Sequence, residues 1–276
     1  MSPIAQAIAD GVIGGRLWLY SNYDCNLTCT YCLTESGPRE APRRLPVERL
    51  PEIAAEGRRT GFTALGLTGG EPFLVDGLAS ALAGMSAELP TLVLTNGTRF
   101  TSRLLAELEP LAGPRLAVQL SLDSADPDQN DAFRRPRNFA RVVAAIQRLR
   151  AVGLRVRVAT TSAGLKPAAL TRLCDLHRSL SVPDEDHVVR PIVRRGRAAD
   201  RGLGIEAGLA ELPAELTITA DGAFWSPFGP TVRGGRLDTD LLLTRTTHPL
   251  SVPATAMLKV AGAAGARPSP DQLRVR

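Results

Sequence analysis

The sequence contains few cysteines, and their placement excludes more than their number does. Only four occur in 276 residues, and three of them lie within eight residues of one another. A secreted, disulfide-stapled domain is richer in cysteine and spaces it more evenly. The three clustered thiols therefore predict a metal or cluster site in a reducing compartment, and we expect a cytoplasmic protein.

Long apolar runs and lysines are also missing or scarce. No run of 18 or more apolar residues occurs, so we expect no membrane span. The first fifteen residues carry Asp10 and no basic start, which is not typical of a signal peptide. The net charge of +5 comes almost entirely from arginines scattered over the chain, because only two lysines occur. We therefore expect an arginine-rich surface and no nucleic-acid partner.

Short apolar runs alternate with helical patterns along most of the chain, which is typical of βαβ units with a parallel sheet. The expected strands are 17–20, 64–68, 92–95, 116–122, 154–160 and 187–192, and the expected helices are 46–59, 75–88, 101–109, one capped by Asn138 that ends before Gly153, and one opened by Pro167. A closed (β/α)8 barrel needs eight such repeats and about 250 residues. The predicted fold is therefore α/β, a partial (β/α)6 TIM barrel, with its ligand at the C-terminal ends of the strands.

The predicted barrel core covers residues 1–192. Residues 193–210 are rich in arginine, glycine and alanine and are predicted to form a linker or crossing segment. Residues 211–276 are predicted to form a small C-terminal α+β extension with a strand at 215–219, a hairpin turn at Asp221-Gly222 and a helix within 253–264. The tail from residue 265 onward is expected to be loose.

Cys25, Cys29 and Cys32 directly follow the first predicted strand with the spacing C-x3-C-x2-C. Three thiolates from one short loop can hold three irons of a [4Fe-4S] cube and leave the fourth iron open to another ligand. A structural zinc site is the alternative, but it needs four protein ligands, and no histidine or second C-x2-C lies nearby. The spacing and the ligand count favour one cluster.

With Tyr31 before its last cysteine, this segment resembles the radical S-adenosylmethionine (radical SAM) family, whose signature is C-x3-C-x-aromatic-C after the first strand of a partial barrel. The resemblance covers residues from about 16 to 192. Its further motifs follow successive predicted strands: Gly69-Gly70-Glu71 after the second, Thr95-Asn96-Gly97 after the third, Ser121-Leu122-Asp123 after the fourth, and then Asp131-Ala-Phe133-Arg134, as in peptide-modifying branches. Each motif alone is ordinary turn chemistry, and their joint order supports the family.

The resemblance implies an enzyme with two cofactors, one [4Fe-4S] cluster and S-adenosylmethionine (SAM). Reductive cleavage of SAM gives methionine and a 5′-deoxyadenosyl radical, which abstracts hydrogen from an unidentified substrate, a small molecule or a peptide. An electron donor such as a flavodoxin or ferredoxin is implied as a partner. We expect the C-terminal segment to cover the open barrel as a lid.

The resemblance also implies which residues bind SAM. Gly69 and Gly70 allow the backbone to approach closely, and their carbonyls and the Glu71 carboxylate are expected to accept hydrogen bonds from the SAM ammonium. The backbone next to Tyr31 is expected to lie over the adenine.

Polar residues at later strand ends complete this predicted site. Ser121 and Asp123 suit the ribose hydroxyls, and Thr95 and Asn96 are expected to bind the cofactor as well. Arg134 is expected either to bind the SAM carboxylate or to form an ion pair on a helix surface.

Two further groups of residues lie outside these motifs. Cys174 shares a predicted helix face with His177, and we expect it to pack in the core, with His177 half-buried at the rim. Arg190, Arg194 and Arg195 lie around the end of the sixth predicted strand, where an anionic group of the substrate could bind.

The chain resembles the SPASM/Twitch branch and the GTP-cyclising enzymes of molybdenum-cofactor biosynthesis, but its C-terminal third lacks the auxiliary-cluster cysteines of both. Ser226 stands where the SPASM pattern has a cysteine, and no cysteine follows Cys174. We therefore expect no auxiliary cluster and a cysteine-less remnant of that extension. A divergent molybdenum-cofactor-related enzyme and a non-catalytic cluster-binding protein remain as alternatives, and the intact SAM motifs count against the latter.

Overall fold

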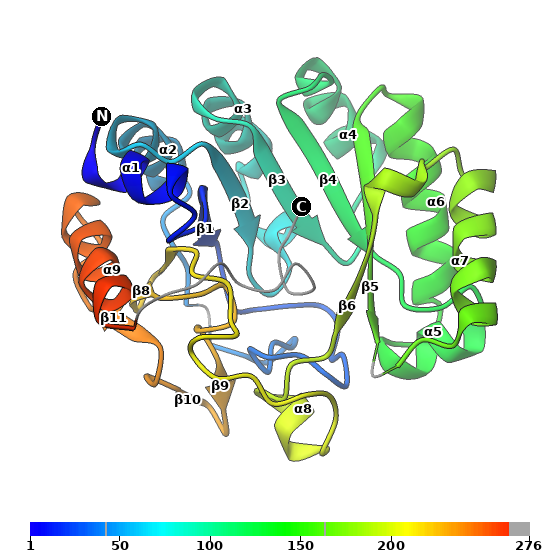
Figure 1. Cartoon of the computed structure of the whole chain (residues 1–276). Helices are drawn as coiled ribbons and strands as arrows, with labels where there is room; N and C mark the ends of the chain where they lie inside the picture. Colours follow the sequence, from blue (N-terminus) through cyan, green and yellow to red (C-terminus); the bar gives the residue numbers. More distant parts are fainter. Residues whose placement is uncertain (42, 163, 265–276) are drawn as a thin grey trace.

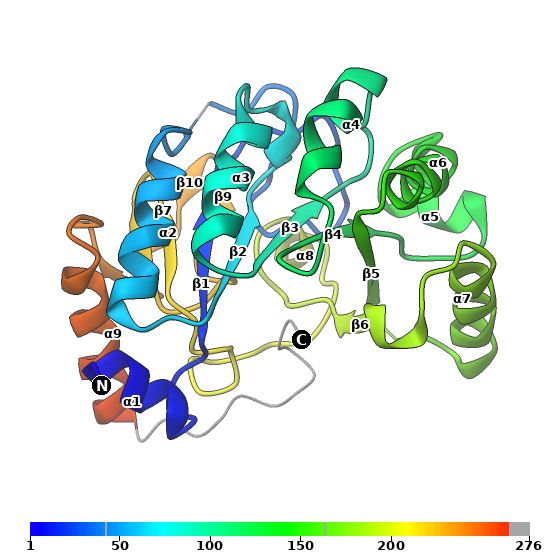
Figure 2. The same cartoon turned by 90° about the horizontal axis from the view of Figure 1, so that it is seen from above.

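A computed structural model describes residues 1–41, 43–162 and 164–264. Its main feature is a nine-stranded sheet with the strand order β11-β8-β7-β1-β2-β3-β4-β5-β6. The sheet curves into an open barrel, and the helices that connect β1 to β6 cover its outer side (Figures 1 and 2).

The strands of this sheet and of a small separate hairpin are short. They are β1 (Arg16–Tyr20), β2 (Ala64–Thr68), β3 (Thr91–Thr95), β4 (Leu116–Ser121), β5 (Arg155–Ser162), β6 (His187–Pro191), β7 (Thr217–Thr219), β8 (Gly222–Phe224), β9 (Val232–Arg233), β10 (Arg236–Leu237) and β11 (Leu242–Thr244). In the part of the chain that the structure describes, strands β9 and β10 form a separate two-stranded sheet.

The helices alternate with strands β1 to β6, whereas β7 to β11 follow one another between α8 and α9. They are α1 (Pro3–Ala9), α2 (Arg49–Thr60), α3 (Leu78–Glu88), α4 (Ser102–Leu108), α5 (Pro127–Phe133), α6 (Asn138–Ala151), α7 (Pro167–Ser179), α8 (Arg197–Asp200) and α9 (Ser251–Ala264), with 3-10 turns at Pro72–Leu74, Glu109–Leu111 and Asp184–Asp186. Within the described ranges, no helix has the length and apolar character needed to cross a membrane.

The predicted partial barrel is confirmed. Strands β1 to β6 pair in parallel in sequence order, as right-handed βαβ crossovers require. Their apolar side chains pack against buried helix residues such as Leu50 and Ile53 of α2 and Val142 and Ile146 of α6. The packing leaves the C-terminal ends of the strands to form one common rim.

Three predicted helix starts differ from the structure. Asn138 does not cap α6, since it is the first helical residue and follows Arg137, whose φ is 66°. The Asp131 carboxylate serves as the cap instead, because it accepts hydrogen bonds from the backbone N–H groups of Arg137 and Phe139. The helices expected from about residues 46 and 75 begin at Arg49 and at Leu78, the second one after a 3-10 turn. The predicted cap at Thr101 is confirmed, because its hydroxyl accepts from the Leu104 N–H.

The C-terminal part continues the barrel sheet. Strand β7 pairs in parallel with β1, and the predicted turn at Asp221-Gly222 joins β7 to the antiparallel β8. Helix α9 lies beside α1, so the two ends of the described chain are close (Figure 1). The division into core, linker and extension stays a prediction, and the tail from residue 265 lies outside the described residues.

Candidate active site

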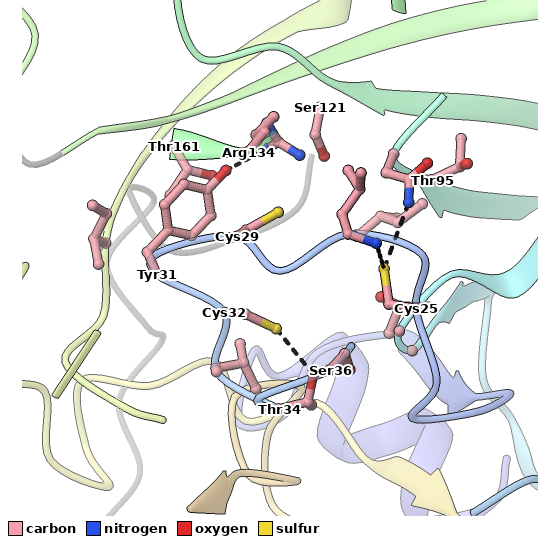
Figure 3. A pocket seen from close by; sticks show the side chains of 18 of the residues that line it. Cys25, Cys29, Tyr31, Cys32, Thr34, Ser36, Thr95, Ser121, Arg134 and Thr161 are labelled. Atoms are coloured by element: carbon pink, nitrogen blue, oxygen red, sulfur yellow. Dashed lines mark hydrogen bonds between the residues drawn. The ribbon is translucent and has the colours of Figure 1, made fainter. Parts of the chain in front are cut away.

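A cavity of about 240 Å3 lies at the C-terminal rim of the barrel, against the loop that carries the three cysteines (Figure 3). Its wall is made by residues from β1 to β6 and by the segments that follow them. The predicted site residues that line it are Cys25, Cys29, Tyr31, Cys32, Gly69, Gly70, Thr95, Asn96, Ser121 and Arg134. Glu71 and Asp123 are buried behind this wall.

The three cysteine side chains point toward one another across this space (Figure 3). The Leu27 N–H and the Asn96 side-chain amide donate to Cys25 Sγ at 3.4 and 3.6 Å, respectively. Among the described residues, no group of three or more His, Cys, Asp or Glu side chains is arranged to hold a single metal ion. A structural zinc ion needs four protein ligands, whereas three thiolates spread over several irons suit a [4Fe-4S] cube, so the three cysteines fit a cluster better than the zinc alternative.

Burial makes two of the thiols hard to ionise in the absence of a metal. It raises the pKa of Cys25 to about 12 and that of Cys29 to about 11, although the nearby Arg134 charge opposes the shift at Cys29. Thiolates are the form that binds iron. The donor set therefore suits a positively charged group that compensates for deprotonation of the cysteines.

The glycine motif is packed tightly against the start of the cysteine loop. Gly69 has a φ of 144°, and a Cβ at Gly70 would lie 2.1 Å from the Asp24 carbonyl oxygen. The Gly70 N–H donates to the Asn22 carbonyl at 2.9 Å, and the Asn22 side-chain amide donates to the Glu71 carbonyl at 3.0 Å. The absence of side chains at both glycines thus allows the two loops to meet at the cavity.

Glu71 connects this motif to the end of β3. Its carboxylate accepts hydrogen bonds from the Phe73 N–H at 3.1 Å, the Thr95 hydroxyl at 2.7 Å and the Asn96 N–H at 2.7 Å. Burial nevertheless raises the pKa of Glu71 to about 7, against the effect of these donors. The carboxylate therefore holds the rim together from behind, and its contact with the SAM ammonium stays a prediction.

Arg134, Asp123 and Tyr31 form a buried network in the opposite wall. Arg134 Nε is 2.7 Å from Asp123 Oδ2, and the Tyr31 hydroxyl donates to the same oxygen at 2.5 Å. Arg134 Nη2 also donates to the Tyr31 oxygen. The alternative of a helix-surface ion pair for Arg134 is wrong, because both partners are buried. The predicted roles of Arg134 toward the SAM carboxylate and of Asp123 toward the ribose stay predictions.

Several wall residues were not predicted. Thr161 at the end of β5 lines the cavity, and its N–H donates to Asp123 at 3.0 Å. Its polar side chain at a strand end was a usable signal. Tyr20 and Phe228 also line the cavity, and the Tyr20 hydroxyl donates to the Pro227 carbonyl at 2.6 Å. This contact between β1 and a segment about 200 residues away has no sequence signature.

The C-terminal segment lies against the cysteine loop. The Val232 N–H donates to the Leu33 carbonyl at 3.3 Å, and Phe228 contributes to the cavity wall. Ser226, at the position where the SPASM pattern has a cysteine, is buried, and its hydroxyl accepts from the Phe228 N–H at 3.4 Å. The serine therefore supports a local turn.

The side chain of Cys174 does not line the cavity. It is half-buried on α7, and its sulfur lies 4.0 Å from His187 Nδ1. The expectation that His177 is half-buried is wrong, because this side chain is fully buried edge-on against the His187 ring. Burial and the proximity of His187 lower the pKa of His177 to about 3, so the pair packs as neutral rings.

The three arginines around the end of β6 have different surroundings. Arg194 is exposed beside Glu206, and Arg195 pairs with Asp240 at 2.6 Å. Arg190 lines the cavity. Of these three candidates for binding an anion, the structure brings only Arg190 to the cysteine site.

The sequence matches the radical SAM superfamily over residues 20–168. This match covers the first strand end, the cysteine loop and all the motifs that line the cavity. The chain belongs to the radical SAM superfamily, whose members use a [4Fe-4S] cluster and SAM.

Curated relatives match about half of the chain. The mycofactocin maturase MftC of Mycolicibacterium smegmatis is 34% identical over 138 residues, which are 48% of this chain and 33% of the relative. A GTP 3′,8-cyclase of Pseudomonas aeruginosa is 36% identical over 135 residues, which are 47% of this chain and 39% of the relative. The matched part thus spans between a third and two fifths of these relatives.

Solved structures support the fold along more of the chain. The anSMEcpe structure with bound AdoMet superposes with a TM-score of 0.63 at 12% identity and covers 87% of this chain and 79% of that chain. Streptococcus suis SuiB bound to S-adenosylmethionine gives a TM-score of 0.56 at 18% identity and covers 67% of this chain and 43% of that chain. Because the identities are low, these likenesses establish the fold alone.

Proposed function

We propose that this protein is an enzyme that cleaves SAM reductively and uses the 5′-deoxyadenosyl radical to abstract hydrogen from a small molecule or a peptide. The observation that carries the proposal is the convergence of Cys25, Cys29 and Cys32 on one cavity whose remaining wall is built from the glycine motif and the polar strand ends. When bound there, the cluster supplies one electron to the SAM sulfonium.

The residues of this chain have separate tasks in that proposal. Cys25, Cys29 and Cys32 hold the cluster and leave one iron for SAM. The backbone at Gly69 and Gly70 lies next to the cysteine loop and lines the same cavity, and in this proposal its carbonyls accept from the SAM ammonium.

The walls on either side shape the site. Ser121 presents a hydroxyl to the cavity for the ribose, while the buried network of Arg134 and Asp123 fixes the ring of Tyr31 beside it. Phe228, from the C-terminal segment, contributes to the cavity wall. Exclusion of water protects a radical from quenching, and in this proposal the C-terminal segment closes over the bound substrate as a lid.

The substrate class rests on the relatives. One curated relative is a maturase and another a GTP cyclase, and SuiB and anSMEcpe were crystallised with peptides. In this proposal, a flavodoxin or a ferredoxin delivers the electron to the cluster.

Anaerobic reconstitution with iron and sulfide, followed by measurement of 5′-deoxyadenosine in the presence of dithionite, tests the proposal. We expect roughly four irons per chain and reductant-dependent cleavage. Cys29→Ala should lose both, whereas Cys174→Ala, whose side chain does not line the cavity, should keep both. Cleavage that persists in Cys29→Ala, or a wild-type protein that takes up no cluster, would overturn it.

A further inference from the structure

Arg190 lies between the cysteine cavity and a second, outer cavity. The outer cavity measures about 410 Å3 and lies beside β6, the edge strand of the sheet. Its apolar lining includes Leu165, Val189, Ile192 and Ile205. Arg190 lines both cavities, and the outer one contains none of the residues predicted to hold the cluster or SAM.

Arg190 is half-buried, and two of its three guanidinium nitrogens lack a hydrogen-bond partner. These atoms, Nε and Nη2, are shielded from solvent and make no hydrogen bond to the described residues. Buried donors are almost always paired in native proteins, and an unpaired one indicates a missing partner. For a guanidinium, the partner that uses its fork of donors is a carboxylate or a phosphate.

The charges that act on Arg190 favour an anionic partner. Arg157 and Arg16 are close enough to act on it, with Glu215 as the opposing carboxylate. Glu215 accepts a hydrogen bond from the Trp18 indole at 2.5 Å, and Asp186 interacts with Arg157 and Arg155. Burial and the two neighbouring arginines lower the pKa of Arg190 to about 10. An anion bound here would offset both effects.

We propose that Arg190 anchors an oxyanion of the substrate, a carboxylate or a phosphate, and that the outer cavity holds an adjoining apolar part of the same molecule. The inference rests on the proposed function, because it places the substrate beside the space assigned to SAM. It adds a chemical class: a molecule with an anionic head and a short apolar body.

Calorimetric titration of the reconstituted protein with three small probes tests this anchor. The probes are 4-methylpentanoate, the isosteric neutral 4-methylpentanamide, and 3-methylbutyl phosphate. We expect one of the anions to bind at least about tenfold more tightly than the amide, and the better anion identifies the head group. Equal affinities for the amide and both anions would overturn the proposal.

Variants separate this role from binding of SAM. Arg190→Gln should abolish the preference for the anion, Arg190→Lys should keep part of it, and the exposed Arg194→Gln should leave it unchanged. The SAM dissociation constant should stay within about twofold in all three variants. If Arg190→Gln loses SAM affinity instead, the guanidinium serves the SAM carboxylate and the proposal is wrong. If Arg190→Gln does not fold, the proposal is still tested by the anion preference of Arg190→Lys and by the comparison of the anions with the amide on the wild-type protein.

The measurement is independent of turnover. Anion binding without any 5′-deoxyadenosine formation would leave the anchor standing and refute the proposed function. Cleavage of SAM without selective anion binding would support the proposed function and refute the anchor.

Discussion

Arg134 and Asp123 form an ion pair that is almost closed to solvent, with Nε 2.7 Å from Oδ2 and side-chain exposures of 5% and 1%. Asp123 also accepts from the Thr161 N–H and the Tyr31 hydroxyl. Removing only one partner of a buried ion pair strongly destabilises a protein, because the other charge stays buried without compensation. This pair links the β4 end, the segment after α5 and the cysteine loop.

Asp123→Asn should therefore destabilise the protein by about 3–5 kcal/mol, since the buried guanidinium keeps its charge and loses its carboxylate. Urea unfolding followed by circular dichroism measures the change. The matched control is Arg103→Gln, which removes a pair whose arginine side chain is 90% exposed, and it should change stability by less than about 1 kcal/mol. Similar losses in the two variants would contradict the inference that the buried network stabilises the wall.

Glu71 should make stability depend on pH near neutrality. Burial raises the pKa of the Glu71 carboxyl in the folded protein to about 7, from its ordinary value of 4.5. The folded chain therefore binds this proton more tightly than the unfolded chain does. Its stabilising effect is therefore fully present below pH 4.5 and is lost as the pH rises through 7.

The expected loss is at most about 3 kcal/mol across that window. Glu71→Gln, which cannot ionise, should flatten the profile measured by urea unfolding from pH 4.5 to 8. The exposed Glu52→Gln should leave it as in the wild type. Parallel profiles for wild type and Glu71→Gln would show that the carboxylate titrates normally.

Arg197 should hold the cysteine loop in the shape that retains the cluster. Its guanidinium donates to the Cys29 carbonyl at 3.3 Å and to the Ser36 carbonyl at 2.8 Å, and its N–H donates to the Cys32 carbonyl at 3.0 Å. Arg197→Gln loses charge-assisted bonds worth roughly 1.5–3 kcal/mol each. We expect iron release to a chelator to become at least about tenfold faster.

The control for this prediction is Arg201→Gln, one turn further along and exposed. It should release iron at the wild-type rate. A wild-type rate in Arg197→Gln would mean that the loop keeps its shape through the cysteines alone.

The barrel and most of the cavity could be predicted from local signals. Apolar runs of strand length and the turn chemistry after them place Cys25, Gly69, Thr95 and Ser121 at one rim, because parallel strands end on the same side. The cysteine spacing adds the cluster. These features depend on residues close together in the sequence.

Contacts between distant segments could not be predicted in this way. The three hydrogen bonds that hold the Glu71 carboxylate in the wall could not be foreseen from its motif, because two of the donors lie at the end of β3. Arg197 and Tyr20 act through partners more than 160 residues away. The pairing of β7 with β1 has the same origin, since its three residues carry no periodicity that specifies a partner strand.

Gly70 should tolerate no side chain, because backbone atoms rather than a movable side chain occupy the space. A Cβ there would lie 2.1 Å from the Asp24 carbonyl oxygen and 2.8 Å from that of Tyr23. Gly70→Ala must therefore push the glycine motif away from the cysteine loop, and we expect SAM affinity to fall at least about tenfold.

Gly262→Ala is the control, since a Cβ at this position in α9 meets nothing within 4 Å, and alanine favours a helix by about 1 kcal/mol. Equilibrium dialysis with SAM and thermal unfolding of both variants measure the effects. Unchanged SAM affinity in Gly70→Ala would show that the cofactor does not depend on the close approach of these two loops.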